Sequence, residues 1–578
     1  MGESGETPRV WARGVEHLLS QPDGRVWTEK GTLDTEQAQL LGALQRFGSL
    51  QEHARALQQH WSLESGSQAE LLAALQSLDE QAWLISEEDI YAPSAERTAT
   101  PISTCAFLTH NRPASLRRAL QDLGKPAADH NRRVLVSDDA EHSQPAGLPD
   151  SMQVEWISRE DRRRWIESLP SKEYKALLSW ALLPEKREGL TTFGSSSNTV
   201  QIAAAGEGVA MLDDDVCGPV GRAPQTEPRR WSISGPGDPS LLLLYDDADS
   251  AIADLLPAPM DAVGLLQTQL GQTVAALGAE LGGQRPELDR GLAASHALSI
   301  RRGGRVLSTM MGIAGDSGMG SPQWYLGLRG DAGRQLDRAY AKRILSRNLI
   351  RSADCFKLSQ SDFFMNACSA CDLREPLVPY FPAGRNSDEL FSASLRAIAP
   401  EDFRLYIPYV VAHHPPEDRA YQTIDLARPL GALPPIGVLL AAVRQWRALE
   451  DQGGDRGHRR QTLGLWLQGL AGMPPARFRE WLQEQRLGQL TGQINWLNQL
   501  LDTVPAHRHG HIQGVLEQAQ HAVGVLRAGP ESTLFAKGHR QEDYQEGMQQ
   551  FGRLLESWAA IVQLGAEYPL QGTLIQAR

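Results

Sequence analysis

Three apolar segments in the middle of the chain each end in a cluster of polar residues. The segments are ISTCAFLTH, RRVLVSDDA and GEGVAMLDDDV, and helical patterns stand between them. Such alternation is typical of a parallel sheet, because parallel neighbours need a long crossover connection. The carboxyl ends of parallel strands meet at one edge of the sheet, and ligands bind beyond that edge. The sequence therefore predicts an α/β core with a site built from residues 109–112, 137–139 and 213–215.

The N-terminal part has a different pattern. Residues 1–92 open with a short β-hairpin in GRVWTEKGTLD, where Asp23-Gly24 supplies a turn, and continue with three helices. Ser49 and Glu52 have the spacing of a capping box at the start of the second helix. A hairpin with three short helices favours a small α+β domain of winged-helix type.

The remaining boundaries follow from composition. A polar linker at residues 94–101 leads into the core, which we place at residues 100–425 with an insertion around residues 220–300. Residues 430–578 carry apolar residues at three- and four-residue spacing, which predicts an all-α C-terminal domain.

Charge and cysteine content narrow the class of protein. The formal net charge of -13 argues against a nucleic-acid partner, since binding to phosphates needs a basic surface. Five cysteines at irregular spacing do not form a disulfide framework, which favours a reducing cytoplasm. The chain shows no secretion signal and no run of 18 apolar residues, so we expect no membrane span.

The acidic triplet is the strongest chemical signal. Asp213 and Asp215 are alternate residues after an apolar strand, so their side chains share one face of an extended segment. Carboxylate oxygens are hard ligands that suit Mn²⁺ or Mg²⁺. Three neighbouring aspartates are also costly to hold together without a cation. The triplet therefore predicts a divalent metal site.

Six segments in order carry a resemblance to a known family. They are FLTHNRPASLRRAL, VLVSDDA, SSSNTVQIAAAGEGVAMLDDDV, GGRVLSTMMGIAGDSGMGSPQWYLGL, VPYFPAGRNSDELFSASLRAI and YIPYVVAHHPPEDR. Together they resemble glycosyltransferases of the GT-A fold, near the inverting family 2. The resemblance implies a Rossmann-like core that binds a nucleotide-diphosphate sugar, with the acidic triplet as its Asp-x-Asp signature.

The resemblance also implies roles for individual residues. The metal ligands would be Asp213 and Asp215, completed by His413 or His414. The general base would be Asp388, aligned on Phe391, with Glu389 as the second choice; the alternative is that these acids only begin a helix. The donor would contact Thr109, Asn111, Arg112, Asp138, Asp139, Asn198, Asp214, Gly315 and Asp316.

The N-terminal phrases DGRVW, LLGAL and LDEQAWLI resemble the small peptide-recognition domains similar to the pyrroloquinoline-quinone biosynthesis chaperone. That resemblance implies a ribosomal peptide as acceptor; without it, a saccharide is the better expectation. The alternative is a helical domain that packs on the enzyme or mediates dimerisation.

The predicted function is metal-dependent transfer of a sugar from a nucleotide-diphosphate sugar to an acceptor hydroxyl or thiol. The alternative is a catalytically degenerate scaffold that binds a nucleotide sugar or a peptide. A nucleotidyltransferase is disfavoured, because FLTHNRPAS lacks the Gly- and Lys-rich phosphate loop that such an enzyme needs near its first strand.

Overall fold

The structure is a computed structural model, and it describes most of the chain. The described residues are 11–14, 19–20, 25–28, 30–44, 46–64, 66–86, 99–141, 148–149, 152–185, 191–235, 237–274, 276–277, 286–288, 294–301, 303–417, 419–427, 432–449, 454–528 and 534–576. The expected turn at Asp23-Gly24 and most of the linker at 94–101 lie outside them.

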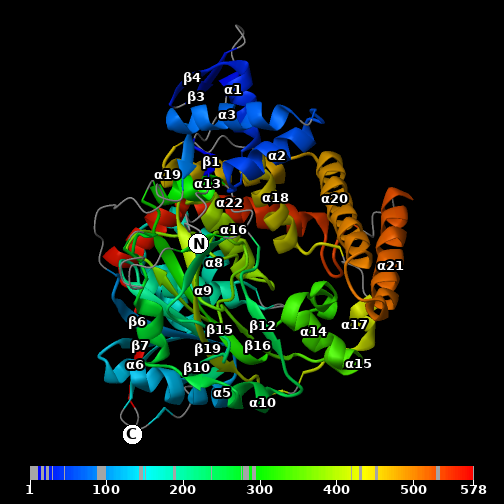
Figure 1. Ribbon diagram of the computed structural model, residues 1–578. Helices are drawn as coiled ribbons and strands as arrows, with labels where there is room; N and C mark the ends of the chain where they lie inside the picture. The colour runs from blue at the N-terminus through cyan, green and yellow to red at the C-terminus, as the bar shows by residue number, and fades with distance from the viewer. Residues whose placement is uncertain are drawn as a thin grey trace.

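The N-terminal part is a small α+β unit, drawn in blue at the top of Figure 1. Its elements are β1 (Trp11–Arg13), β2 (Leu19–Ser20), β3 (Val26–Thr28), β4 (Gly31–Leu33), α1 (Thr35–Ala43), α2 (Leu50–His60), α3 (Ser67–Glu80) and β5 (Leu84–Ser86). Strands β2, β3 and β4 form an antiparallel sheet, and β1 pairs with β5. The capping box of Ser49 and Glu52 is confirmed at the start of α2. The unit has its own apolar core, while Ile85 packs into the core of the next part.

One large mixed sheet forms the centre of the molecule. Its strands run in the order β14-β11-β17-β19-β15-β18-β9-β6-β7-β8-β20, and β10, β12, β13 and β16 pair along its side. Their bounds are β6 (Ile102–Thr109), β7 (Arg133–Asp138), β8 (Gln153–Ile157), β9 (Gly208–Asp213), β10 (Val216–Arg222), β11 (Trp231–Ser234), β12 (Leu241–Leu244), β13 (Leu256–Pro257), β14 (Glu287–Leu288), β15 (Val306–Asp316), β16 (Asn348–Ser352), β17 (Phe356–Ser359), β18 (Cys368–Asp372), β19 (Phe403–His413) and β20 (Thr573–Gln576).

The predicted parallel unit is confirmed, and the sheet around it is mixed. Strands β6, β7, β8 and β9 are parallel neighbours. Strand β18 then runs antiparallel to both β9 and β15, so β15 has the same direction as β9. The segment around residues 220–300, expected as an insertion, contributes strands β11 to β14 to this sheet.

Helices cover both faces of the sheet, which makes the centre a three-layer α/β/α structure. Alternate residues of β6 show this directly: Ala106 and Leu108 face one apolar core, and Cys105 and Phe107 face the other. The second face is covered by α5 (Pro113–Ala119), the π-helical turn Leu120–Gly124, α6 (Lys125–Asp129), α11 (Ala262–Gln267) and α13 (Ala294–Arg301). The first face is covered by α7 (Arg159–Ser168), α8 (Lys172–Leu182), α9 (Phe193–Ala203), α16 (Ser387–Ile398) and helices from the C-terminal part.

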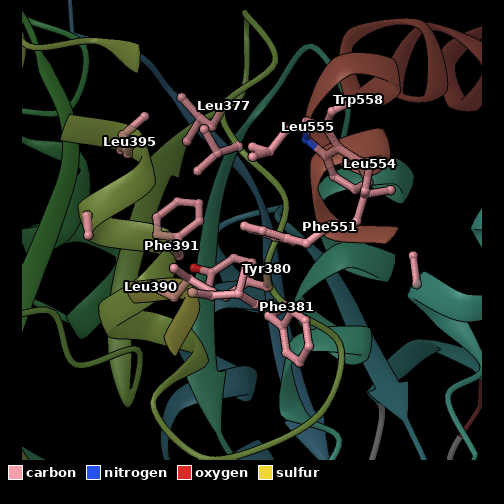
Figure 2. Close-up of a cluster of buried hydrophobic side chains, with 14 of the residues drawn as sticks. Leu377, Tyr380, Phe381, Leu390, Phe391, Leu395, Phe551, Leu554, Leu555 and Trp558 are labelled. Atoms are coloured by element: carbon pink, nitrogen blue, oxygen red, sulfur yellow. The ribbon is translucent and has the colours of Figure 1, made fainter. Parts of the chain in front are cut away.

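The C-terminal part is helical, as its periodicity predicts. Its helices are α18 (Pro435–Leu449), α19 (Arg456–Ala471), α20 (Pro475–Leu501), α21 (His509–Ala528) and α22 (Gln541–Glu567). Figure 2 shows Phe551, Leu554 and Trp558 of α22 packed toward Tyr380 and Phe391 of the first-face core. Strand β20 then returns to the central sheet and pairs antiparallel with β8.

A second group of helices lies to one side. Helices α20 and α21 form a hairpin, seen at the right of Figure 1, that packs on a smaller apolar core with α14 (Gly330–Arg338) and α17 (Thr423–Ala427). Short elements complete this region: the 3-10 turns Pro322–Gly327 and Ala506–Arg508, and α15 (Tyr340–Arg343). Helix α10 (Ala248–Ala253) lies elsewhere and packs on β15 and β16. No helix among the described residues is both long enough and apolar enough to cross a bilayer.

Candidate active site

The strand register brings most of the predicted site residues to one edge of the sheet. Leu108 of β6 pairs with Asp213 at the end of β9, so Thr109 and the acidic triplet are adjacent. His413 at the end of β19 pairs with Gly315 of β15 on one side and with Val216 of β10 on the other. The register thus places the ends of four strands around the acidic triplet.

Gly315 is required where β15 approaches β19. Its φ is 115°, and a Cβ at this position would lie 2.5 Å from the carbonyl oxygen of His413. Only glycine fits this backbone without strain. Gly315, which was expected to contact the donor, therefore has a structural function: it lets the two strand ends lie close together.

Asp214, which is buried, pairs with the partly exposed Arg112 where β6 and β9 end. The Thr109 hydroxyl donates to Asp214 Oδ2 at 2.7 Å. Arg112 Nη1 lies 3.2 Å from Asp214 Oδ1 and 3.1 Å from Asp215 Oδ2. Burial and the charge of Asp215 raise the pKa of Asp214 to about 6. A third of the Arg112 side chain is exposed, so Arg112 can also bind an anion from the solvent side. The neighbouring Asn111 is exposed and has a φ of 55°.

His413 connects Asp215 to Asp316. Its Nδ1 donates to the Asp316 carbonyl oxygen at 2.6 Å, and its Nε2 lies 3.4 Å from Asp215 Oδ1. Burial acts to lower the pKa of His413, but the hydrogen bond and charge of Asp215 outweigh burial and raise the pKa. The Asp316 carboxylate is held in turn by two hydrogen bonds from Arg347, at 2.7 and 2.9 Å.

This arrangement has the features of a metal-ligating histidine. A ligating imidazole almost always donates its other N–H to a carbonyl or carboxylate oxygen, as His413 does to Asp316. With Nδ1 donating, Nε2 faces the Asp215 carboxylate. His414 is placed differently: its backbone N–H donates to the Asp215 carbonyl oxygen, and its buried Nδ1 has no partner in the part of the chain that the structure describes.

Of the three aspartates, Asp213 is the one whose negative charge is least stabilised by hydrogen bonds or ion pairs among the described residues. Its side chain is half-buried, and no described residue donates a hydrogen bond to its carboxylate. Burial, followed by the charges of Asp215 and Asp214, raises the pKa of Asp213 well above its usual range. The described part of the chain holds no group of three His, Cys, Asp or Glu side chains already arranged as a metal site. The donor chemistry nevertheless fits a hard divalent cation, because a cation between Asp213 and Asp215 would neutralise this excess of negative charge.

Asp388 lies in the first turn of α16 and faces the triplet. Its Oδ1 accepts from the Glu389 N–H at 3.0 Å, and the Asn366 N–H also donates to it. Burial raises the pKa of Asp388 to about 6, and its charge contributes to the raised pKa of Asp213. Glu389 is directed elsewhere, since its Oε1 accepts from Arg444 of α18 at 2.9 Å. Of the two acids, Asp388 is therefore the one beside the triplet.

Two of the predicted donor residues are engaged inside the protein. Asp139 accepts hydrogen bonds from Arg159 and Arg162 at 3.1 and 2.9 Å, and it is 2% exposed. Asp138 accepts from the Ala140 N–H at 2.8 Å, in the turn that follows β7. These contacts fix the end of β7 and the start of α7, so Asp139 has an internal structural role.

Asn198 acts as a clamp on a neighbouring segment. Its Oδ1 accepts from the Tyr380 N–H at 2.7 Å, and its Nδ2 donates to the Tyr380 carbonyl oxygen at 2.9 Å. The Tyr380 ring stacks on Phe391 at 4.2 Å, three residues after Asp388 on the same helix. Asn198 therefore positions the segment that packs beneath the Asp388 side of α16.

We expect Asn198→Ala to lower the free energy of unfolding by about 2–4 kcal/mol, because two buried backbone groups of Tyr380 lose their partner. Urea denaturation followed by circular dichroism measures this. Asn498→Ala, at an exposed position of α20, is the matched control and should change stability by less than about 0.5 kcal/mol. Equal effects of the two substitutions would show that the clamp contributes nothing.

The His413–Asp215 pair predicts a particular dependence of stability on pH. The pKa of His413 is raised to about 9 from 6.5, so its stabilisation is complete below about pH 6.5 and is lost as the pH rises through about 9. Between these values, in EDTA, the stability difference between wild type and His413→Gln should shrink by roughly 2–3 kcal/mol. A difference that stays constant over this range would contradict the ion pair.

Three residues near the site were not predicted from the sequence. Arg347 holds Asp316, the Asn366 N–H supports Asp388, and the buried Tyr380 hydroxyl has no hydrogen-bond partner among the described residues. Arg347 and Asn366 lie outside the six segments, and Tyr380 lies in the fifth without a role implied by the resemblance, so only spatial proximity identifies them.

Comparisons with protein-family models, with curated proteins and with solved structures found no match for this chain.

Proposed function

We propose that the protein is a metal-dependent glycosyltransferase with a GT-A-type core, which moves a sugar from a nucleotide-diphosphate sugar to an acceptor hydroxyl or thiol. The observation that supports this most is the meeting of Asp213, Asp215 and His413 with Asp388 at the carboxyl edge of the sheet. In an open α/β sheet this edge is where ligands bind.

The metal would be held by Asp213 and Asp215, and by His413 Nε2 once the cation displaces the proton that Nε2 shares with Asp215. Mn²⁺ or Mg²⁺ in this position would neutralise charge on the diphosphate as it leaves the sugar. Arg112, at the start of α5, supports the same task, because its exposed side can pair with a phosphate oxygen.

Asp388 is the general base of the proposed reaction. Its carboxylate takes the proton of the acceptor hydroxyl or thiol while the acceptor attacks the anomeric carbon and the bond to the diphosphate breaks. The raised pKa of about 6 suits this role, since the group is ionised at neutral pH and is still a useful proton acceptor. A direct displacement of this kind inverts the configuration of the anomeric carbon.

The N-terminal unit is the proposed acceptor-recognition domain, for a ribosomal peptide. Its separate apolar core and its exposed Trp27 support a binding role for this unit. A saccharide acceptor would need no such unit and is the second possibility.

Donor hydrolysis tests the proposed function without knowledge of the acceptor. The purified protein is incubated with a panel of UDP-, GDP- and dTDP-sugars, with Mn²⁺ or EDTA, and release of the nucleoside diphosphate is measured. Metal-dependent release from one donor supports the enzyme. Metal-dependent binding of a nucleotide without release from any donor would favour the degenerate binding scaffold.

A further inference from the structure

A cavity of about 480 Å³ lies beside the segment that leads into α16. It is formed between the end of α8, the segment at residues 381–386, the start of α18 and the start of α22. Asn386, which lines the cavity, immediately precedes α16 and is two residues from Asp388. The cavity therefore borders the helix turn that carries the proposed base.

The walls of this cavity are apolar and firmly packed. Trp180 and Phe381 meet edge to face at 5.5 Å, and Phe381 contacts Phe551 of α22 at 5.7 Å. Ile436 and four prolines complete the apolar lining. Aromatic rings held in this way offer a large contact area for an apolar ligand group at little entropic cost.

The rim of the cavity is acidic. Among the described lining residues, the acidic side chains are Asp543 and Glu546 of α22 and Glu185, and the cationic side chains are Arg385 and, when protonated, His539. Such a rim disfavours an anionic diphosphate and attracts a cation. The Thr191 hydroxyl in the wall is buried and has no hydrogen-bond partner among the described residues, so it can meet a polar group of the ligand.

We propose that this cavity binds the acceptor, through an apolar group that carries or adjoins a positive charge. The proposal rests on the proposed function, because it makes the cavity the acceptor side of a site whose donor side is the acidic triplet. The acceptor chemistry it selects is an aromatic or aliphatic side chain next to a basic group, as in a basic hydrophobic peptide.

Three matched fluorinated probes test the charge and the apolar part separately. Binding of 4-fluorobenzylamine, 4-fluorobenzyl alcohol and 4-fluorobenzoate is measured by fluorine NMR on the full-length protein. We expect the amine to bind at least about tenfold more tightly than the benzoate, with the alcohol between them. Glu546→Gln should reduce the preference of the amine over the alcohol by about two- to fivefold.

Filling the cavity tests its location. Gly547 lies in α22 and lines the cavity, and a Cβ there would meet the Phe381 ring at an ordinary 3.5 Å. Gly547→Leu should therefore weaken amine binding by at least about tenfold, and the smaller Gly547→Ala should weaken it less. Gly488→Leu in α20, where nothing lies within 4 Å of an added Cβ, is the matched control and should leave binding unchanged.

Nucleotide binding is measured on the same samples, so that the two proposals can fail separately. Amine binding that Gly547→Leu removes supports the cavity even if no nucleotide binds, in which case only the glycosyltransferase assignment fails. Equal amine binding by wild type, Gly547→Leu and Gly547→Ala would overturn the cavity proposal. Benzoate binding as tight as amine binding would also overturn it.

Discussion

Asp213→Asn and Asp215→Asn are each expected to abolish sugar transfer and to weaken metal-dependent nucleotide binding by at least about 100-fold. Each substitution removes one charged oxygen ligand from the proposed metal site and leaves the side-chain size unchanged. Isothermal titration calorimetry with Mn²⁺ measures the affinity, and release of the nucleoside diphosphate measures the transfer.

The two substitutions should differ in their effect on the metal-free protein. Burial and the charges of its acidic neighbours raise the pKa of Asp213, so Asp213→Asn removes an unfavourable buried charge and should not lower the melting temperature in EDTA. Asp215 pairs with Arg112 and His413, so Asp215→Asn should lower it. Asp331→Asn, at an exposed position of α14, is the control for both. Normal metal-dependent binding by either site variant would refute the metal assignment.

Asp388→Asn is expected to lower the turnover number by about 10²- to 10⁴-fold, the usual contribution of a general base. Donor affinity should be unchanged, because the base acts only on the acceptor. In the wild type the rate should rise with pH through about 6, since Asp388 accepts a proton only after it has ionised. Steady-state kinetics across pH 4.5–8 measures both effects.

Glu389→Gln is the matched control for the base. Its carboxylate is paired with Arg444, so loss of the charge should affect the contact between α16 and α18 and leave most of the turnover. If Glu389→Gln removed turnover and Asp388→Asn did not, the two acids would have to exchange roles.

The local elements near the site could be predicted from the sequence because their signals are local. Continuous apolar segments identify β6, β7 and β9, a helical pattern identifies α9, and the structure confirms them. The crossover rule then places Thr109 and Asp213 at the same edge, since it depends only on the order of strands and helices. The sequence could not show that β18 lies between β9 and β15 and runs antiparallel to both, because the residues of a strand do not indicate its direction in the sheet.

The roles of single polar residues were less predictable, because a role depends on partners that are distant in the sequence. In the sequence, Asn198 is only one residue of a predicted helix. Its hydrogen-bond partner Tyr380 is 182 residues later and reaches the Asn198 amide only in the folded protein. The structural role of Asp139 likewise depends on hydrogen bonds from Arg159 and Arg162, which can form only when α7 packs on the sheet. His413 and His414 are neighbours in the sequence, and the pairing of β19 with β15 decides which of them faces Asp215.

The proposed donor site can be tested by calorimetric titration of the wild-type protein with nucleoside diphosphates, in Mn²⁺ and in EDTA. We expect one nucleotide to bind only with metal, and this binding to disappear in Asp215→Asn. Binding by no nucleotide, or equal binding with and without metal, would contradict the proposal that the acidic triplet is the donor site of a glycosyltransferase.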